Sequence, residues 1–187
     1  MKRIILIHLL LGACLIVQAQ KEPLATPYAV PVDSITGLIT YEGVIETKNV
    51  SAGVLYARMF GWFREYYKNP AEVIRENDST AYVIIGKPRF RISNPPSKDG
   101  LKSDGGTIQY TITVAAREGR FKYELTAFNW KQLSYYPCER WLDTEASSYA
   151  PVYNDYLQQL DKTALETINS LKDAMIHEKP VKDKDNW

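Results

Sequence analysis

The sequence holds few of the side chains on which common catalytic sites depend. Its 187 residues include two histidines, His8 and His177, and two cysteines, Cys14 and Cys138. We expect His8 and Cys14 to leave with an N-terminal signal, so one residue of each kind remains. Hydrolytic triads, zinc sites and imidazole acid–base chemistry generally require histidine. We therefore predict no catalytic residues, no metal site and no cofactor, and the single cysteine excludes a disulfide-stapled scaffold.

Cys138 and His177 each have a structural interpretation. Cys138 follows two tyrosines and a proline, and we predict a partly buried, small apolar side chain there. The alternative, a nucleophile, would need a histidine partner, and only His177 is available. His177 falls in the last turn of a predicted helix, where a cation suits the carbonyl end of the helix dipole. No second histidine follows four residues later, so the zinc-peptidase motif is absent.

The chain also lacks a strong charge of either sign. Its formal net charge is +1, and loss of Lys2 and Arg3 with the signal leaves 21 basic against 22 acidic side chains. No basic run longer than two residues occurs after the signal. A protein that binds a phosphate backbone needs a concentrated positive surface. We therefore predict no nucleic-acid partner, and only a basic patch assembled by folding would change this.

The one long apolar run lies at the N-terminus and predicts export. Lys2 and Arg3 precede an apolar run over residues 4–17, and Val17-Gln18-Ala19 is a small-x-small cleavage site. We predict a signal peptide over residues 1–19, a mature protein that begins at Gln20, and a location in the periplasm or cell envelope. The run is shorter than the roughly 20 residues that span a bilayer, so we predict no transmembrane segment after cleavage.

A lipoprotein is the alternative interpretation of this signal. Leu11-Gly12-Ala13-Cys14 resembles a bacterial lipobox, in which the cysteine becomes the lipidated first residue. The chain would then turn polar after Cys14, whereas Leu15, Ile16 and Val17 continue the apolar run. The intact mass of the exported protein distinguishes the two, because a diacylglycerol adduct on Cys14 would identify the lipoprotein.

The 168 residues after the signal fit one domain with a two-layer core. Residues 20–36 contain Pro23, Pro27 and Pro31, which disfavour helix and suit an extended leader. We expect a single folded domain over residues 37–178, followed by a frayed, charged tail over residues 179–187.

Within the domain, the hydrophobic pattern alternates between the period of a strand and that of a helix. Residues 38–47 alternate as a strand with one wet face, and Ser51 can cap a helix over residues 52–68 whose aromatic face is wide. Residues 107–116 and 121–128 form the clearest hairpin, with Phe121, Tyr123, Leu125 and Ala127 predicted to point inward. The other predicted elements are strands at 71–76 and 81–92, a loop at 93–106, an irregular segment at 129–150 and a helix at 152–177. Gly86 and Pro88 break the strand at 81–92, which suggests a bulge or a sheet edge there.

The predicted strands and helices combine into one simple architecture. Two amphipathic helices need a hydrophobic sheet face, and strands with polar outer faces provide one on a single side. We therefore predict an α+β, two-layer sandwich in the order β-α-β-β-β-β-α. Its sheet would be antiparallel and roughly five-stranded, with both helices on one face.

The start of the domain is similar to a known family. Residues 31–46, PVDSITGLITYEGVIE, resemble the opening of a domain of unknown function found in exported proteins of Gram-negative, often gut-dwelling, bacteria. The aromatic pair Trp62 and Phe63, the tetrad IIGK at residues 84–87 and the final helix are also similar, so the resemblance covers roughly residues 31–175. It implies a TATA-binding-protein-like (TBP-like) fold. It implies no activity or catalytic residue, and the name of the fold does not imply DNA binding.

Four aromatic side chains are the candidate surface for a ligand or partner: Trp130, Tyr135, Tyr136 and Trp141. Aromatic rings offer large apolar faces, often with a polar tip, that can stack on sugar rings or on a partner protein. The alternative is that they close one end of the core. We predict a non-catalytic binding or accessory module of the cell envelope whose partner is an envelope protein or a glycan.

A carboxylate-based hydrolase acting on glycan or peptidoglycan is the alternative function. Glu42 and Glu46 share the wet face of the first predicted strand, about 13 Å apart at two pleats, which exceeds the separation that glycosidases use. Glu124 is a possible neighbour of either one. Solvated surface charges explain all three as well. Self-assembly through a sheet edge is a third hypothesis and predicts oligomers in solution scattering.

Two short segments match a pattern for O-glycosylation of exported proteins. Asp33-Ser34-Ile35 and Asp78-Ser79-Thr80 each place a hydroxyl between an aspartate and an apolar residue or threonine. The alternative is a linker and a turn. A mature mass equal to that of the bare polypeptide would reject the modification.

Overall fold

The structure is a computed structural model that describes residues 26–132 and 134–177. The predicted signal peptide with Cys14, the first part of the leader and the tail at residues 179–187 lie outside the described residues. None of the helices in the described part has the length and apolar character needed to cross a membrane.

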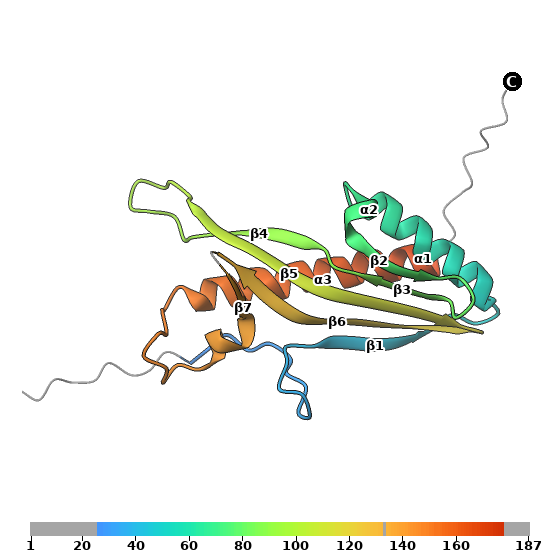
Figure 1. Cartoon of the computed structure of the whole chain (residues 1–187), viewed down its shortest axis with the longest axis horizontal. Helices are drawn as coiled ribbons and strands as arrows, with labels where there is room; N and C mark the ends of the chain where they lie inside the picture. The colour runs from blue at the N-terminus through green and yellow to red at the C-terminus, as the bar shows by residue number, and fades with distance from the viewer. Residues whose placement is uncertain (1–25, 133, 178–187) are drawn as a thin grey trace, which may run out of the picture.

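The described chain forms one sheet, two long helices and two short helical turns (Figure 1). In chain order the elements are β1 (Tyr41–Glu46), α1 (Ala52–Tyr66), α2 (Pro70–Val73), β2 (Ile74–Asp78), β3 (Val83–Gly86), β4 (Arg89–Ser93), β5 (Asp104–Arg117), β6 (Arg120–Lys131), β7 (Tyr135–Pro137), the 3₁₀ helix η1 (Cys138–Leu142) and α3 (Tyr153–Ile176).

Every strand pairing in the sheet is antiparallel, and the order across it is β1-β6-β5-β3-β2. Two short strands share these positions: β4 pairs with the first part of β5, and β7 pairs with the last part of β6. The sheet therefore has seven strands but is five positions wide. The strand predicted over residues 81–92 is two strands, since the chain breaks at Lys87 and Pro88 between β3 and β4.

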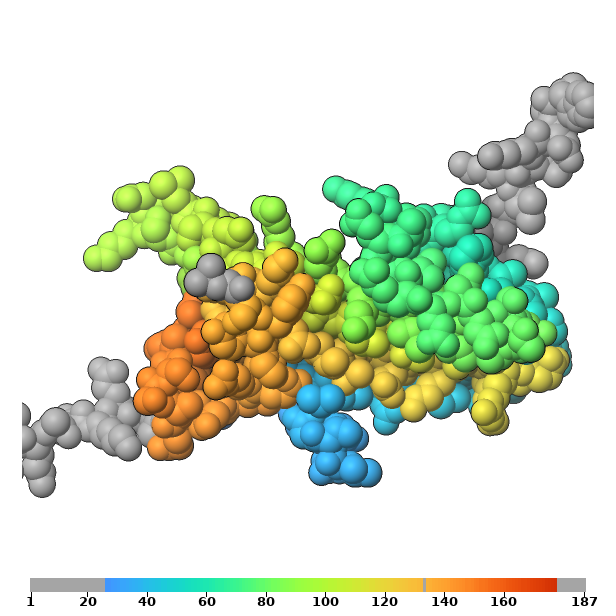
Figure 2. All heavy atoms as spheres, viewed as in Figure 1, coloured from blue at the N-terminus to red at the C-terminus, as the bar shows by residue number. Residues whose placement is uncertain are grey.

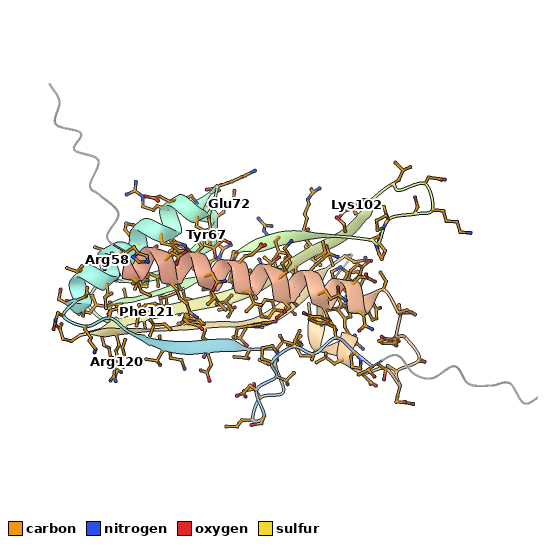
Figure 3. All side chains as sticks on the ribbon, turned by 180° about the vertical axis from the view of Figure 1, so that it is seen from behind. Arg58, Tyr67, Glu72, Lys102, Arg120 and Phe121 are labelled. Atoms are coloured by element: carbon orange, nitrogen blue, oxygen red, sulfur yellow. The ribbon has the colours of Figure 1, made fainter. Side chains whose placement is uncertain are left out.

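Both long helices cover the same face of the sheet, as the sequence predicts. Helix α1 contacts β3, β5 and β6 and also packs on α3, which in turn reaches β4 and η1. Figure 3, seen from behind, shows α3 lying along the sheet beside α1. The core is the layer between them. It is formed by the inner sides of β5 and β6 and by the apolar faces of the helices.

Helix α1 begins and packs as its sequence indicates. The Ser51 side chain accepts a hydrogen bond from the Val54 amide at 3.3 Å, which caps the first turn. Leu55, Met59, Trp62 and Phe63 are buried on one face. The helix ends at Tyr66, two residues before the predicted end.

The strand predicted over residues 71–76 is wrong at its start. Residues Pro70–Val73 form the helical turn α2, and the strand begins only at Ile74. Proline suits the first position of a helix because it has no amide hydrogen to satisfy there. This local preference outweighs the apolar pattern of the segment.

The inward position predicted for Ala127 is also wrong, because β6 contains a bulge. Gln109 pairs with Asn129 while Thr111 pairs with Thr126, so Tyr110 faces two residues of β6. Ala127 takes a positive φ of 52° in this bulge. The alternation shifts by one residue, and Phe128 becomes the buried side chain at 1% exposure.

Segments predicted as loop or leader join the folded body. Strand β5 begins at Asp104, inside the predicted loop at 93–106, and the predicted irregular segment holds the end of β6, β7 and η1. Upstream, the Tyr28 amide donates to the Asn154 side chain at 2.8 Å, and Tyr28 and Val30 pack on the core. The folded part therefore starts before Gly37, although residues 33–37 project from the body (blue in Figure 2).

Candidate functional site

A hollow lined by aromatic side chains lies where β6, β7, η1 and the start of α3 meet. We call it the aromatic hollow. Its volume is about 290 Å³, and its lining residues are Trp130, Gln132, Tyr136, Pro137, Arg140, Trp141, Ser148 and Tyr153. Three of the four aromatic residues predicted as a ligand surface are among them. Tyr135 is not.

Trp130, Trp141 and Tyr153 hold one another in place within the hollow. The ring centroids of Trp130 and Trp141 are 5.5 Å apart in an edge-to-face arrangement. Trp141 stacks on Tyr153 at 5.6 Å, with the ring planes 24° apart. Edge-to-face and offset-stacked arrangements are the favoured geometries for such pairs. The hollow thus has a rigid aromatic wall.

Trp130 is fixed further by the backbone of β5. Its indole N–H donates to the Gly105 carbonyl at 2.8 Å. The next residue, Gly106, has a φ of +104°, and a Cβ there would lie 2.6 Å from the Trp130 Nε1 atom. The sequence Gly105-Gly106 therefore lets the indole approach the strand closely. This contact places the Trp130 ring at the end of the core.

Burial separates the four predicted residues into two kinds. Trp141 is only 2% exposed, which fits the alternative that it closes the end of the core. Tyr136 is 40% exposed at the rim, and the Arg140 guanidinium lies 5.7 Å from the centre of its ring. The hollow therefore combines the buried ring of Trp141 with the accessible ring of Tyr136 and with Arg140, whose N–H groups can donate to a ligand.

Tyr135 lies on the other side of β7. In the register of β6 and β7, Tyr136 is opposite Trp130 and Tyr135 is opposite Lys131. Neighbouring residues of a strand point to opposite faces, so Tyr135 points to the open face of the sheet, where the Lys131 ammonium lies 5.6 Å from its ring centre. Grouping Tyr135 with the other three is thus not supported by the geometry.

Sequence reasoning missed Arg140 and Tyr153 as members of the hollow. Arg140 lies in η1, and Tyr153 opens α3 after a long connection, so only the tertiary fold brings both to Trp130. One signal was available for Arg140, since it lies beside Trp141 and four residues from Tyr136. For Tyr153 the sequence carries no comparable signal.

The carboxylates predicted as an alternative site form an exposed ion group. Glu42 is directly opposite Glu124, and the Lys122 ammonium lies 2.7 Å from Glu42 Oε2 and 3.8 Å from Glu124 Oε2. The hydrogen bond to Glu42 raises the pKa of Lys122. Glu42 and Glu124 also line a hollow of about 320 Å³ beside Thr40, whereas Glu46 lies opposite Arg120.

This arrangement suits charge pairing better than acid catalysis. The carboxylates of Glu42 and Glu124 both face the Lys122 ammonium on the open surface of the sheet. All three side chains of the group, Glu42, Lys122 and Glu124, are more than one third exposed. Glu42 lines the hollow beside Thr40, and Glu46 is not among the residues that line it.

Cys138 and His177 occupy structural positions. Cys138 is fully buried, and burial raises the pKa of its thiol well above the ordinary value, with Glu139 adding to the effect. His177 follows the last turn of α3, where its amide donates to the Asp173 carbonyl at 3.0 Å. Within residues 26–132 and 134–177, no three His, Cys, Asp or Glu side chains gather in a group able to hold a metal ion.

The two Asp-Ser segments share one geometry. Asp33 Oδ1 accepts hydrogen bonds from the Ile35 and Thr36 amides, and Asp78 Oδ1 accepts from the Thr80 and Ala81 amides. Both are Asx-turns on the surface, and Ser34 and Ser79 are exposed at them. The turn predicted at Asp78 is therefore confirmed, and the segment at Asp33, for which the alternative was a linker, is a turn as well, while modification of both stays a prediction.

Comparison with known proteins places the sheet in a family. Residues 41–131 match the family described as a domain of unknown function (DUF4468) with TBP-like fold. The matched region, residues 41–131, belongs to the DUF4468 family. It runs from the first residue of β1 to the last residue of β6. The DUF4468 region therefore supplies Trp130, whereas Tyr136, Arg140, Trp141 and Tyr153 come from the chain that follows it.

Two solved structures have the same fold. A TBP-like protein from Parabacteroides distasonis ATCC 8503 aligns with a TM-score of 0.63 and 12% identity, over 80% of this chain and 99% of that one. A DUF4468 family protein from Bacteroides ovatus ATCC 8483 aligns with a TM-score of 0.64 and 16% identity, over 80% of this chain and 92% of that one. Comparison with curated proteins gives no match. The predicted family and TBP-like α+β fold are confirmed, and identities this low show the fold alone.

Proposed function

We propose that the mature protein is a non-catalytic binding or accessory module of the bacterial cell envelope, and that the aromatic hollow is its ligand site. The predicted signal peptide supports the location. The observation that carries the site is the combination of a rigid wall of Trp130, Trp141 and Tyr153 with the exposed Tyr136 and Arg140 at the rim.

The chemistry of the hollow favours a sugar ring of an envelope glycan. Ligand pockets span about 300–1,000 Å³, so a volume of about 290 Å³ suits a single ring or side chain. The apolar face of a sugar can stack on Tyr136, while its hydroxyls can accept hydrogen bonds from Arg140. An apolar side chain of an envelope protein would use the stacking surface alone.

A matched pair of variants tests this function. We expect Tyr136→Ala to weaken binding of peptidoglycan and glycan fragments to the mature protein about tenfold or more, because it removes an exposed ring from the hollow. Tyr135→Ala is the control, because it removes a ring of similar exposure, 48% against 40% for Tyr136, from the other face of β7. Calorimetric titration measures both. Equal losses, or no binding of any glycan or envelope protein tested, would contradict the proposal.

The structure gives no reason to prefer the hydrolase. The carboxylates it would need are Glu42, Glu46 and Glu124, and the first and last of them share the Lys122 ammonium in an exposed group. We therefore propose one function only. Activity on cell-wall substrates that survives Glu42→Gln combined with Glu46→Gln would also count against carboxylate chemistry at these positions.

A further inference from the structure

A second hollow lies on the open face of the sheet, at the end of the β5–β6 hairpin. We call it the hairpin-end hollow. Its volume is about 300 Å³, and it is lined by Val44, Ala115, Arg117, Arg120 and Lys122. The two small apolar side chains form part of its floor, and three cationic side chains surround them. It is separate from the aromatic hollow, with which it shares no lining residue.

Arg117 and Arg120 place two positive charges side by side at the hollow. They are directly opposite each other in the register of β5 and β6. Like charges in this position destabilise a sheet. Within the described residues neither guanidinium has a carboxylate at ion-pair distance, whereas the third cation, Lys122, pairs with Glu42 at 2.7 Å. Two positive charges are thus left at the hollow.

Nearby carboxylates are mostly engaged elsewhere. Glu118, in the hairpin turn, accepts a hydrogen bond from the Ala52 amide at 3.2 Å, at the start of α1. Asp78, at the end of β2, accepts from two amides of its own turn. Glu46 is the exception, because it lies opposite Arg120 in the register of β1 and β6 and makes no ion pair among the described residues.

A basic hollow at the other end of the same face provides a contrast. It is lined by Arg89, Arg91 and Lys131 among others. There Arg89 lies 3.5 Å from Glu72, and Lys131 lies against the Tyr135 ring. Two of these three cations, Arg89 and Lys131, therefore already contact other side chains of the protein. At the hairpin-end hollow, by contrast, Arg117 and Arg120 make no ion pair with any described residue.

From this geometry we propose that the hairpin-end hollow binds a doubly charged phosphate group, either a phosphate monoester or a diphosphate. Two guanidinium groups match such an anion in charge, and their donor forks match its oxygens. Val44 and Ala115 give the carbon part of the ligand an apolar contact. The group belongs either to a soluble phosphate ester or to a lipid headgroup. This site goes beyond the proposed function and does not depend on it.

Titration of the mature protein with pyrophosphate tests the site. We expect saturable binding that weakens about tenfold in Arg117→Ala and in Arg120→Ala, since each removes charge-assisted hydrogen bonds. Glu46→Gln has the opposite expected effect, a severalfold gain, because it removes a negative charge beside the anion. Nuclear magnetic resonance of the amides at both ends of the hairpin reports the position.

The control removes an equal charge far from the hollow. Lys102 and Arg120 lie at opposite ends of the molecule (Figure 3), so Lys102→Ala keeps pyrophosphate affinity if the site is specific. Lack of saturable binding both of pyrophosphate and of vesicles that contain phosphatidic acid would overturn the proposal. An equal loss in Lys102→Ala and Arg120→Ala, or no gain in Glu46→Gln, would also overturn it, because these results indicate attraction by net charge alone.

Vesicles distinguish the two sources of the phosphate. Sedimentation with vesicles that contain phosphatidic acid, lost in Arg120→Ala and absent with phosphatidylcholine alone, supports a lipid headgroup. Binding of pyrophosphate without sedimentation supports a soluble phosphate ester. Failure of both arms overturns the site and leaves the glycan test of the aromatic hollow unaffected, since that test uses Tyr136.

Discussion

At the scale of single residues, glycine decides where the aromatic hollow forms. The Trp130 indole reaches the Gly105 carbonyl because the adjacent Gly106 carries no side chain. Gly106 also holds a φ of +104°, in a region that favours glycine. A close approach and an unusual backbone angle thus coincide at one position. Gly106, which is not among the lining residues of the hollow, thus helps to position Trp130 in its wall.

The first prediction concerns this contact. Gly106→Ala should lower the free energy of unfolding by about 1–3 kcal/mol through backbone strain, with more lost by displacing the indole. Gly100→Ala is the control, because Gly100 has a φ of +77° but nothing within 4 Å of the new Cβ. Urea unfolding and tryptophan fluorescence measure both variants. Equal losses and an unshifted emission for Gly106→Ala would refute the role of the close approach.

At the scale of elements, the sequence predicts what depends on neighbouring residues and misses what depends on distant partners. The hairpin of β5 and β6 and the helix after Ser51 follow from local alternation and capping. The bulge at Ala127 does not, because it is defined by how β5 opposes β6. Nor does the Glu42–Glu124 pairing, which needs the register of β1.

The same division holds for the candidate site. Trp130, Tyr136 and Trp141 were predictable as a group because aromatic residues concentrate in one stretch of sequence. The separation of Tyr135 from Tyr136 required the knowledge that residues 135–137 form a strand. Tyr153 required the packing of α3 on η1. Local sequence patterns therefore indicate which segment supplies most of the aromatic residues, and tertiary packing determines which residues line the hollow.

Gly61 in helix α1 gives a prediction at the scale of a single element. Gly61 lies inside α1, and a Cβ there would have nothing within 4 Å. Gly61→Ala should raise the free energy of unfolding by about 0.5–1 kcal/mol, because alanine loses less backbone entropy in a helix. Thermal unfolding followed by circular dichroism measures it. A lowered free energy of unfolding would contradict this expectation, because it would mean that the new methyl group at residue 61 is not accommodated on this surface of α1.

At the scale of the whole molecule, tyrosine hydroxyls link the layers. Tyr67 of the α1 end and Tyr110 of β5 lie with their hydroxyls 3.4 Å apart, near Thr167 of α3. Tyr41 of β1 and Tyr28 of the leader both donate to Asp161 of α3, at 2.8 and 3.0 Å. The N-terminal segment, the sheet and both helices are therefore joined by hydroxyl groups that must stay protonated.

This arrangement predicts loss of stability in base. Burial raises the pKa of Tyr67 and Tyr110 above the ordinary value, and burial with the Asp161 charge raises that of Tyr41. The unfolded chain ionises near pH 10, so the free energy of unfolding should hold below that pH and fall above it. Urea unfolding at pH 8 and at pH 11 measures the effect. Tyr67→Phe should reduce the decline, whereas Tyr135→Phe, at an exposed tyrosine, should not; an equal decline in all three proteins would contradict this origin.

We propose above that a ligand of the cell envelope binds in the aromatic hollow. The most direct measurement follows the indole N–H signals of the mature protein by nuclear magnetic resonance as glycan fragments are added. We expect the signals of Trp130 and Trp141 to move together and saturate. The signal of Trp62, whose indole N–H donates to Ser170 between α1 and α3, should stay in place. Saturable binding that leaves the Trp130 and Trp141 signals unchanged would show that the ligand binds outside the aromatic hollow.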